Sequence, residues 1–301
     1  MSELLLRRRN LLLRKQEEMN IRAVCFKADG EQTVAITKVD SAPDITMQYS
    51  YDGVNWNAWD LSALTFGGST KVYVRGVGNT NFGGSGSAYN QFTFSTDSYV
   101  YVSGIAESLL DGDNEVLTYS YGYTLARLFY QQTALRSAEG LRFEATGAAG
   151  WTCNYIYAYM FAGCTNLLYA PKALSFESFS VGYECAYMFS DCTSLLTAPT
   201  LPATTLSKRC YQKMFYGCTS LVDAPELPAT TLQSYCYEYM FQNCTSLKTI
   251  RCRAKVTASS ATSNWMSGVK TAGTFYGHSE YGWATGASGI PATWTFEELT
   301  N

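Results

Sequence analysis

The sequence predicts a multidomain chain in which an N-terminal all-β sandwich is followed by an α/β solenoid of short repeats. Two observations lead to this fold class. Residues 21–108 follow a two-residue rhythm of apolar and polar side chains with frequent turns, and the stretch from Leu128 to Cys252 repeats one short pattern five times. Repetition at such a period is typical of a solenoid, because one unit cannot bury its apolar face without neighbours.

We divide the chain accordingly into a docking peptide (1–20), a β-sandwich (21–108), the repeats (109–252) and a C-terminal cap (253–301). In the sandwich we expect strands at Arg22–Lys27, Thr33–Val39, Ile45–Tyr51, Val54–Trp59, Lys71–Gly76, Gln91–Ser95 and Tyr99–Ser103. The sequence Tyr51-Asp-Gly-Val54 predicts a hairpin between the third and fourth of these strands. Asp111–Asn114 is expected to form a turn in the join between the two domains.

The repeats are aligned by a Met-Phe pair whose copies begin at Leu128, Met160, Met188, Met214 and Met240, at intervals of 32, 28, 26 and 26 residues. Within the fourth copy, four apolar residues recur at i, i+4, i+5 and i+8: Cys210, Met214, Phe215 and Cys218. This spacing predicts one face of a helix about two turns long.

A short extended piece follows that helix, and Leu221, Ala224 and Leu227 recur along it. Pro225 has no amide hydrogen to donate, so we expect this piece to be irregular and weakly paired. Helix, extended piece and return loop in 26 residues are typical of leucine-rich repeats.

The repeat Tyr-Met-Phe-x-x-Cys-Thr-Ser-Leu-x-x-Ala-Pro-x-Leu-Pro-Ala-Thr-Thr-Leu resembles the BspA-like leucine-rich repeats of Bacteroides-type gut bacteria and their phages. The segments Thr262–Lys270 and Gly289–Trp294 resemble the usual ending of such proteins. The first copy departs most, with Leu128 in place of Met and Gln132 in place of Cys. The resemblance implies a leucine-rich-repeat fold in a surface or virion protein, and it implies no particular ligand.

The ten cysteines include nine between positions 153 and 252. Pairs within one unit, such as Cys210 and Cys218, share a face but lie too far apart for a disulfide. Cys192, Cys218 and Cys244 should stack from unit to unit as buried free thiols. Some disulfides or a metal site are the alternatives, although no Cys-x-x-Cys pair is present.

The charge balance argues against nucleic acid as a partner. The chain has a formal net charge of −3, and its basic residues cluster only near the N-terminus. That terminus has no apolar run longer than three residues, so it predicts neither a signal peptide nor a membrane span. We therefore expect assembly in a host cytoplasm and a place on a virion, with the bacterial cell surface as the alternative.

Residues 1–20 combine leucine triplets with arginines and are expected to become ordered on docking into other virion proteins. The expected docking residues are Leu4, Leu5, Arg7, Arg8, Arg9, Leu11 and Leu12. A solvated, partly helical tail is the alternative. The seven-residue spacing of Leu5, Leu12 and Met19 allows a short bundle, from which we predict a homotrimer.

No pattern in the chain indicates catalysis, a metal or a cofactor. His278 is the only histidine, and no nucleophile signature accompanies it. The repeats instead vary at positions off the Cys/Met/Phe face, and these positions carry the candidate ligand surface: Tyr159, Tyr187, Tyr216 and Tyr239. The alternative for Tyr159 and Tyr239 is sideways packing against neighbouring helices.

Together these features predict a non-enzymatic phage structural protein, either a fibre or a decoration. It would dock on the particle through its N-terminus and present the repeats to a host-surface protein or glycan. A bacterial cell-surface adhesin is the first alternative, and a glycan-cleaving enzyme is the second.

Overall fold

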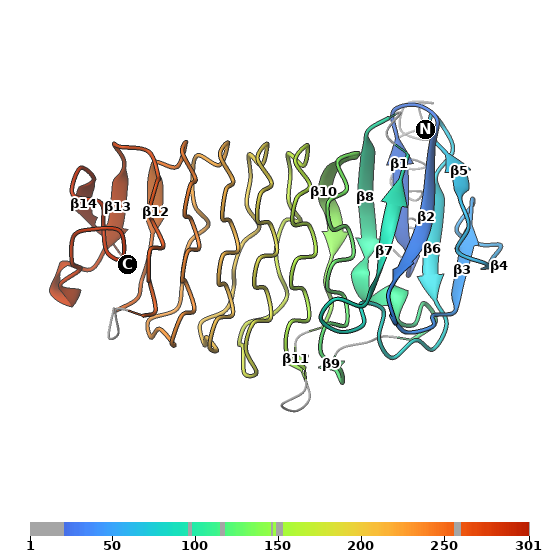
Figure 1. The fold of residues 1–301 in the computed structure, drawn as a ribbon, viewed down its shortest axis with the longest axis horizontal. Coiled ribbons are helices and arrows are strands. Elements are labelled where there is room, and N and C mark those ends of the chain that lie inside the picture. The colour runs from blue at the N-terminus through green and yellow to red at the C-terminus, as the bar shows by residue number, and fades with distance from the viewer. Residues whose placement is uncertain are drawn as a thin grey trace, which may run out of the picture.

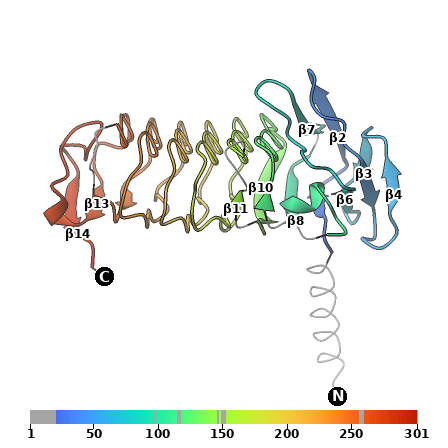
Figure 2. The same ribbon diagram turned by 90° about the horizontal axis from the view of Figure 1, so that it is seen from below.

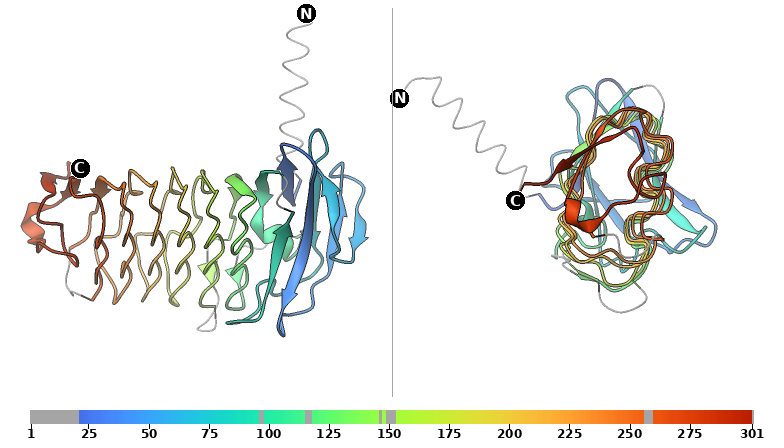
Figure 3. Two further views of the ribbon diagram at one scale, coloured as in Figure 1. Left: turned by 45° about the horizontal axis from the view of Figure 1, so that its top comes forward. Right: turned by 90° about the vertical axis from the view of Figure 1, so that its left-hand side faces the viewer.

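The computed structural model describes residues 21–95, 98–114, 118–145, 147–148, 153–255 and 260–300. A β-sandwich lies at one end of an elongated molecule, and the repeats follow it as a row of stacked coils (Figures 1 and 2). Viewed along the row, the coils superpose on one oval outline (Figure 3). We number the coils 1 to 6 and identify each by its residue at the position of the repeat methionine. These residues are Leu128, Met160, Met188, Met214, Met240 and Trp265.

Two sheets form the sandwich. The first has the order β10-β8-β1-β6-β3-β4, and the second has the order β5-β2-β7. Their strands are β1 (Val24–Ala28), β2 (Gln32–Val39), β3 (Met47–Ser50), β4 (Asn57–Trp59), β5 (Leu64–Phe66), β6 (Val72–Gly76), β7 (Tyr89–Phe94), β8 (Val100–Ile105) and β10 (Leu135–Arg142). Phe26 of β1 lies between the sheets, with its ring centroid 5.0 Å from that of Phe92 in β7 and 6.3 Å from that of Phe66 in β5.

The predicted hairpin joins β3 to β4, which pair antiparallel with Met47 opposite Trp59. Gly53 has a φ of +77°, and the Asp52 carboxylate accepts hydrogen bonds from the amides of Val54 and Asn55, both at 2.8 Å. β5, a strand of only three residues, is not among the strands expected from the sequence.

The predicted α/β solenoid is wrong. The described part of the chain is nearly all β and contains no α-helix, and its only helical segments are the 3-10 turns η1 (Ala106–Leu109) and η2 (Ser279–Tyr281). The stretches expected to be helices are runs of consecutive turns. In coil 2, Tyr155 and Tyr159 are both left-handed, with φ of 57°, and Gly163 follows with φ of 74°. A left-handed residue at every fourth position prevents an α-helix, because its amide and carbonyl point away from the helical direction.

The backbone amides of these turn runs donate hydrogen bonds to two kinds of acceptor, in alternation along the chain. The amides of Tyr157, Tyr159 and Phe161 donate to carbonyls of coil 3 at 2.8, 3.1 and 2.9 Å. The amides of Ala158 and Met160 donate instead to the carbonyls three residues earlier, at 3.1 and 3.2 Å. The ladder between coils therefore replaces the internal hydrogen bonds of a helix.

The core of the solenoid is a stack of phenylalanine rings, one from each of coils 1 to 5. Successive centroids are 5.2 to 5.7 Å apart, and interplanar angles do not exceed 14°: Phe129, Phe161, Phe189, Phe215 and Phe241. Offset stacking of this kind stabilises a pair beyond the burial of its area.

A column of cysteines lies beside the phenylalanines. The thiol of Cys218 donates to the carbonyl of Phe189 in the preceding coil at 3.1 Å, and Cys192 and Cys244 repeat the contact at 3.1 and 3.0 Å. The eight cysteines from 164 to 252 are buried free thiols, as predicted: Cys164, Cys185, Cys192, Cys210, Cys218, Cys236, Cys244 and Cys252.

The extended pieces that follow the turn runs form the other side of the solenoid, which we call the extended side. Isolated bridges there join coil 2 to coils 1 and 3, and coil 4 to coil 5. Asp223 pairs with Thr249 and Leu227 pairs with Cys252, on either side of Pro225. Continuous strands return in β12 (Thr249–Arg251), β13 (Thr274–Gly277) and β14 (Thr295–Glu298), which form a parallel sheet at the C-terminal end. Prolines interrupt the ladder in the inner coils because they donate no hydrogen bond.

The sandwich and the coils share one core. β10 belongs to coil 1 and pairs parallel with β8, and the ring of Phe129 stacks on Phe92 of β7 at 5.6 Å. The short strands β9 (Thr118–Tyr119) and β11 (Gly147–Ala148) pair in the same region. Beneath them, buried Glu107 of η1 accepts a hydrogen bond from the hydroxyl of Tyr119 at 2.7 Å.

Coil stacking continues into the region expected to be a cap. The amide of Phe241 donates to the carbonyl of Trp265 at 2.9 Å, and Asn264 and Gly268 are left-handed like their counterparts in earlier coils. The buried indole of Trp265 lies over Tyr237, with the ring centroids 6.1 Å apart. Residues 260–268 therefore form the turn run of a sixth coil before β14 closes the array.

Candidate functional site

The turn runs place three columns of left-handed residues along the solenoid, and none of these residues is β-branched. Column A consists of Tyr123, Tyr155, Tyr183, Arg209 and Tyr235. Column B consists of Arg127, Tyr159, Tyr187, Lys213 and Tyr239. Column C consists of Gln131, Gly163, Asp191, Gly217 and Asn243.

Tyrosines in columns A and B stack from coil to coil. Tyr159 and Tyr187 have ring centroids 4.5 Å apart at an angle of 12°, and Tyr155 and Tyr183 have centroids 4.4 Å apart at 18°. Chains that pair in a β ladder lie about 4.7–4.9 Å apart, which is close to the stacking distance of aromatic rings. The ladder between coils therefore holds the rings in contact.

A cation replaces tyrosine in both columns at coil 4. The Arg209 guanidinium lies 5.3 Å from the ring centroid of Tyr183 and 4.5 Å from that of Tyr235. The Lys213 ammonium lies 5.2 Å from the centroids of both Tyr187 and Tyr239. All four distances are within the range of cation–π attraction, so the cations extend the stacks instead of interrupting them.

A groove of about 400 Å³ runs along column B on the side of column C. Its position follows from side-chain size: Tyr130 and Tyr216 project at its ends, whereas the equivalent residues of coils 2 and 3 are the smaller Ala162 and Ser190. The stacked tyrosines of column B line it, as does Lys213. Its volume is within the range of about 300–1,000 Å³ that is usual for small-molecule sites.

Polar residues and glycines alternate along column C, and the polar residues contribute hydrogen-bonding groups to the groove. A Cβ at position 217 would lie 2.5 Å from Asp191 Oδ1, and a Cβ at position 163 would lie 2.9 Å from Gln131 Cγ. Each glycine therefore leaves room for the polar side chain of the preceding coil. Ser190 Oγ donates to Asp191 Oδ2 at 3.0 Å, and the carboxylate is exposed in the groove.

The Tyr159 hydroxyl of the groove is neutral near pH 7. Burial, followed by the neighbouring Tyr187, raises the pKa of Tyr159 to about 12. A neutral phenol both donates and accepts a hydrogen bond, so this wall of the groove offers ligand contacts of either kind.

The structure brings the predicted ligand residues together in part. Tyr159, Tyr187 and Tyr216 line the groove, and Tyr239 contacts the groove through Lys213. All four are partly exposed, and Tyr159 also packs sideways on Tyr187, as the alternative interpretation expected. The predicted docking residues lie outside the described part of the chain: Leu4, Leu5, Arg7, Arg8, Arg9, Leu11 and Leu12.

Sequence reasoning missed column A and the polar residues of column C. A signal for column C was present, because the position before the repeat cysteine is occupied by Gly163, Asp191, Gly217 and Asn243. Glycine, asparagine and aspartate are the residues that most readily adopt the left-handed conformation. This pattern indicates a turn at that position rather than the end of a helix.

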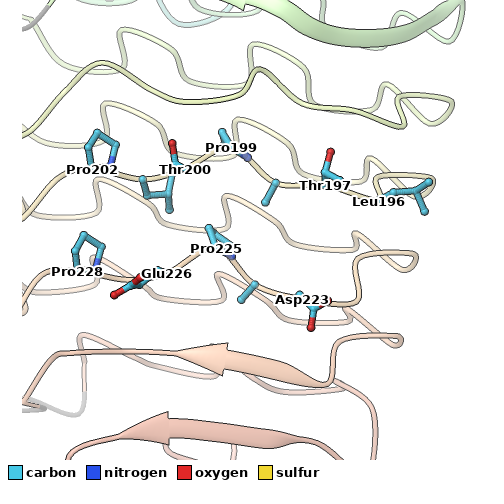
Figure 4. A pocket seen from close by; sticks show the side chains of 12 residues that line it. Leu196, Thr197, Pro199, Thr200, Pro202, Asp223, Pro225, Glu226 and Pro228 are labelled. Carbon is cyan, nitrogen blue, oxygen red and sulfur yellow. The ribbon is translucent and has the colours of Figure 1, made fainter. Parts of the chain in front are cut away.

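A second hollow, of about 520 Å³, lies on the extended side between coils 3 and 4. Figure 4 shows Pro199 beside Pro225 and Pro202 beside Pro228. Its charged groups are acidic, and Glu226 is already paired with Arg253 at 2.7 Å. The tyrosine-lined groove is the stronger candidate, because a cation, a carboxylate and hydroxyls converge there.

Within the described ranges, no group of three histidine, cysteine, aspartate or glutamate side chains is placed to hold a metal ion. His278 lies 3.5 Å from the carboxylate of Glu298 near η2. Among the same residues, no helix has the length and apolar character needed to cross a bilayer.

Comparisons of the chain with protein-family models, with curated proteins and with solved structures give no match. The groove and the columns beside it are therefore the basis for assigning a function.

Proposed function

We propose that the protein is a non-enzymatic structural component of a phage particle that binds a host-surface glycan through the tyrosine-lined groove. The observation that carries the proposal is the groove itself, where the stacked rings of Tyr159 and Tyr187 meet the exposed carboxylate of Asp191. Sugars present apolar C–H faces and many hydroxyl groups, so a site for them needs both aromatic surface and hydrogen-bonding groups.

The polar groups of the groove suit hydroxyl ligands. Asp191 accepts hydrogen bonds, the Ser190 hydroxyl donates to Asp191 and can still accept, and the Gln131 amide both donates and accepts. Tyrosine adds contact area at a small cost in conformational entropy, since it has few rotatable bonds. The backbone ladder between coils already holds these side chains in place, so little ordering is needed on binding.

The groove favours binding over cleavage. Asp191 is the only carboxylate among the residues that line it, and most glycoside hydrolases use two carboxyl groups across the scissile bond. Hydrolysis of a host capsule by the purified protein would restore the enzymatic alternative.

The binding proposal is tested with the purified full chain on an immobilised glycan array, followed by calorimetric titration of the glycans that are retained. We expect Tyr187→Ala to weaken binding at least about tenfold, because it removes a groove wall and a ring that contacts Lys213. Tyr169→Ala is the matched control. Tyr169 is exposed, lies on the extended side of coil 2 and does not line the groove. Equal losses in the two variants would show that the groove is not the site.

Docking on the particle is proposed for residues 1–20, which would contact other virion proteins. A chain that lacks these residues should fold but fail to enter particles, and normal incorporation would refute the docking role. The predicted homotrimer can be measured by light scattering of the full chain. Localisation in infected and uninfected cells distinguishes a virion protein from the alternative, a bacterial cell-surface adhesin.

A further inference from the structure

Lys213 is the cation of the groove, and tyrosine rings surround it. Its ammonium lies 5.2 Å from the ring centroids of Tyr187 and Tyr239 and 5.5 Å from that of Tyr216. The rings stabilise the positive charge through their negative faces, but they accept no conventional hydrogen bond from it. All three N–H donors of the ammonium therefore need another partner.

The described part of the chain offers no such partner. Its ion pairs leave Lys213 without a carboxylate within 4.0 Å, and its hydrogen bonds include none donated by the Lys213 ammonium. Arg209, the cation of column A in the same coil, differs because it donates to the Tyr183 hydroxyl at 2.5 Å. Lys213 is thus half-buried, charged and able to bind an anionic group that enters the groove.

The rest of the groove limits what that anion can be. Tyr130 and Tyr216 stand three coils apart, roughly 14 Å at β-ladder spacing, and they bound a space for a short ligand. The Asp191 carboxylate in the same groove repels a ligand that carries charge along its whole length, such as a nucleic acid. A ligand with one localised negative charge and several hydroxyls matches both groups.

We propose that the groove selects a saccharide that bears a carboxylate, such as a sialic or uronic acid. The Lys213 ammonium binds the sugar carboxylate, and Asp191 accepts hydrogen bonds from ring hydroxyls. The ion pair forms beside tyrosine rings that exclude water, where it is stronger than at an open surface. This inference rests on the proposed glycan-binding function and adds the charge class of the ligand.

The test compares matched acidic and neutral probes by calorimetric titration of the full chain. The pairs are sialyllactose with lactose, and trigalacturonate with its methyl ester. We expect the acidic member of at least one pair to bind about tenfold more tightly than its neutral counterpart, and we expect this preference to fall as salt screens the charge.

Lys213→Gln should abolish the preference, read as the ratio of the affinities for the acidic and neutral members of a pair in that variant. Lys208→Gln, at an exposed lysine of the same coil outside the groove, should keep it. Circular dichroism checks that both variants fold, and the acid-to-neutral ratio of the unaltered protein tests the inference without any substitution. Equal binding of both members of each pair overturns the inference and leaves glycan binding intact, whereas no binding of any saccharide overturns both.

Discussion

The rings of Phe215 and Phe241 lie in parallel planes, with an interplanar angle of 1° and centroids 5.7 Å apart. The two residues occupy equivalent positions in coils 4 and 5, and both are fully buried. Each ring forms part of the core for the coil before it and the coil after it. The stability of a coil therefore depends on its neighbours, as expected for a one-dimensional array.

Replacing Phe215 with alanine should destabilise the protein by about 3–5 kcal/mol, since it removes one ring from the stack and leaves a cavity bordered by two others. Urea unfolding followed by circular dichroism measures the loss. Leu196→Ala is the control, because Leu196 is 46% exposed and its truncation should change the free energy of unfolding by about 0.5 kcal/mol or less. Similar losses in both variants would contradict the stacked core.

Gly217→Ala should destabilise the turn run of coil 4 by about 1–3 kcal/mol. Gly217 has a φ of +70°, and the added Cβ would lie 2.5 Å from Asp191 Oδ1. Asn243→Gly changes the equivalent residue of coil 5, where φ is 63°, and it should be neutral or slightly stabilising. The melting temperatures of the two variants give the comparison, and an unaffected Gly217→Ala protein would show that this position does not require glycine.

Glu107 should make stability depend on pH. Burial raises the pKa of this carboxyl, although hydrogen bonds from Tyr119 and from the amides of Glu144 and Ala145 oppose the shift. The folded state therefore holds the proton more tightly than the unfolded chain does. The resulting stability is fully present below the ordinary glutamate pKa and is lost as the pH rises through the raised pKa.

The measurement is the free energy of unfolding between pH 4 and pH 8 for the unaltered protein and Glu107→Gln. Glutamine stays neutral, can accept from the Glu144 amide and can donate to the hydroxyls of Tyr119 and Tyr157. Relative to this variant, the unaltered protein should lose up to about 1.4 kcal/mol per pH unit within the titration window. Parallel pH profiles would contradict the assignment.

The repeat cysteines should resist thiol reagents in the folded protein. Burial raises the pKa of Cys164, Cys244 and Cys252 to about 12, so almost no reactive thiolate is present at neutral pH. With an aromatic disulfide reagent, the eight cysteines from Cys164 to Cys252 should not react before unfolding, and at least eight thiols should react in denaturant without prior reduction. A lower total in denaturant would indicate disulfides.

Much of the candidate site could be predicted from variation among the repeats. Tyr159, Tyr187 and Tyr216 were identified because they lie off the apolar face, and all three line the groove. The groove itself could not be predicted, because it forms where large side chains of some coils, such as Tyr130, lie beside small ones of neighbouring coils, such as Ala162. Asp191 was missed because it was read as part of a helix, not as a left-handed residue opposite Gly217.

By itself, the sequence determined that the units repeat and which of their residues are buried: Cys210, Met214, Phe215 and Cys218 all lie in the core. Only the tertiary structure decided that these residues form a turn run and not a helix. A left-handed residue at every fourth position reproduces the i, i+4, i+8 spacing of a helical face, so the apolar pattern is the same for both conformations. The turn run is selected by hydrogen bonds from amides such as that of Phe215 to the carbonyls of the next coil, and these partners lie about one repeat away in the sequence.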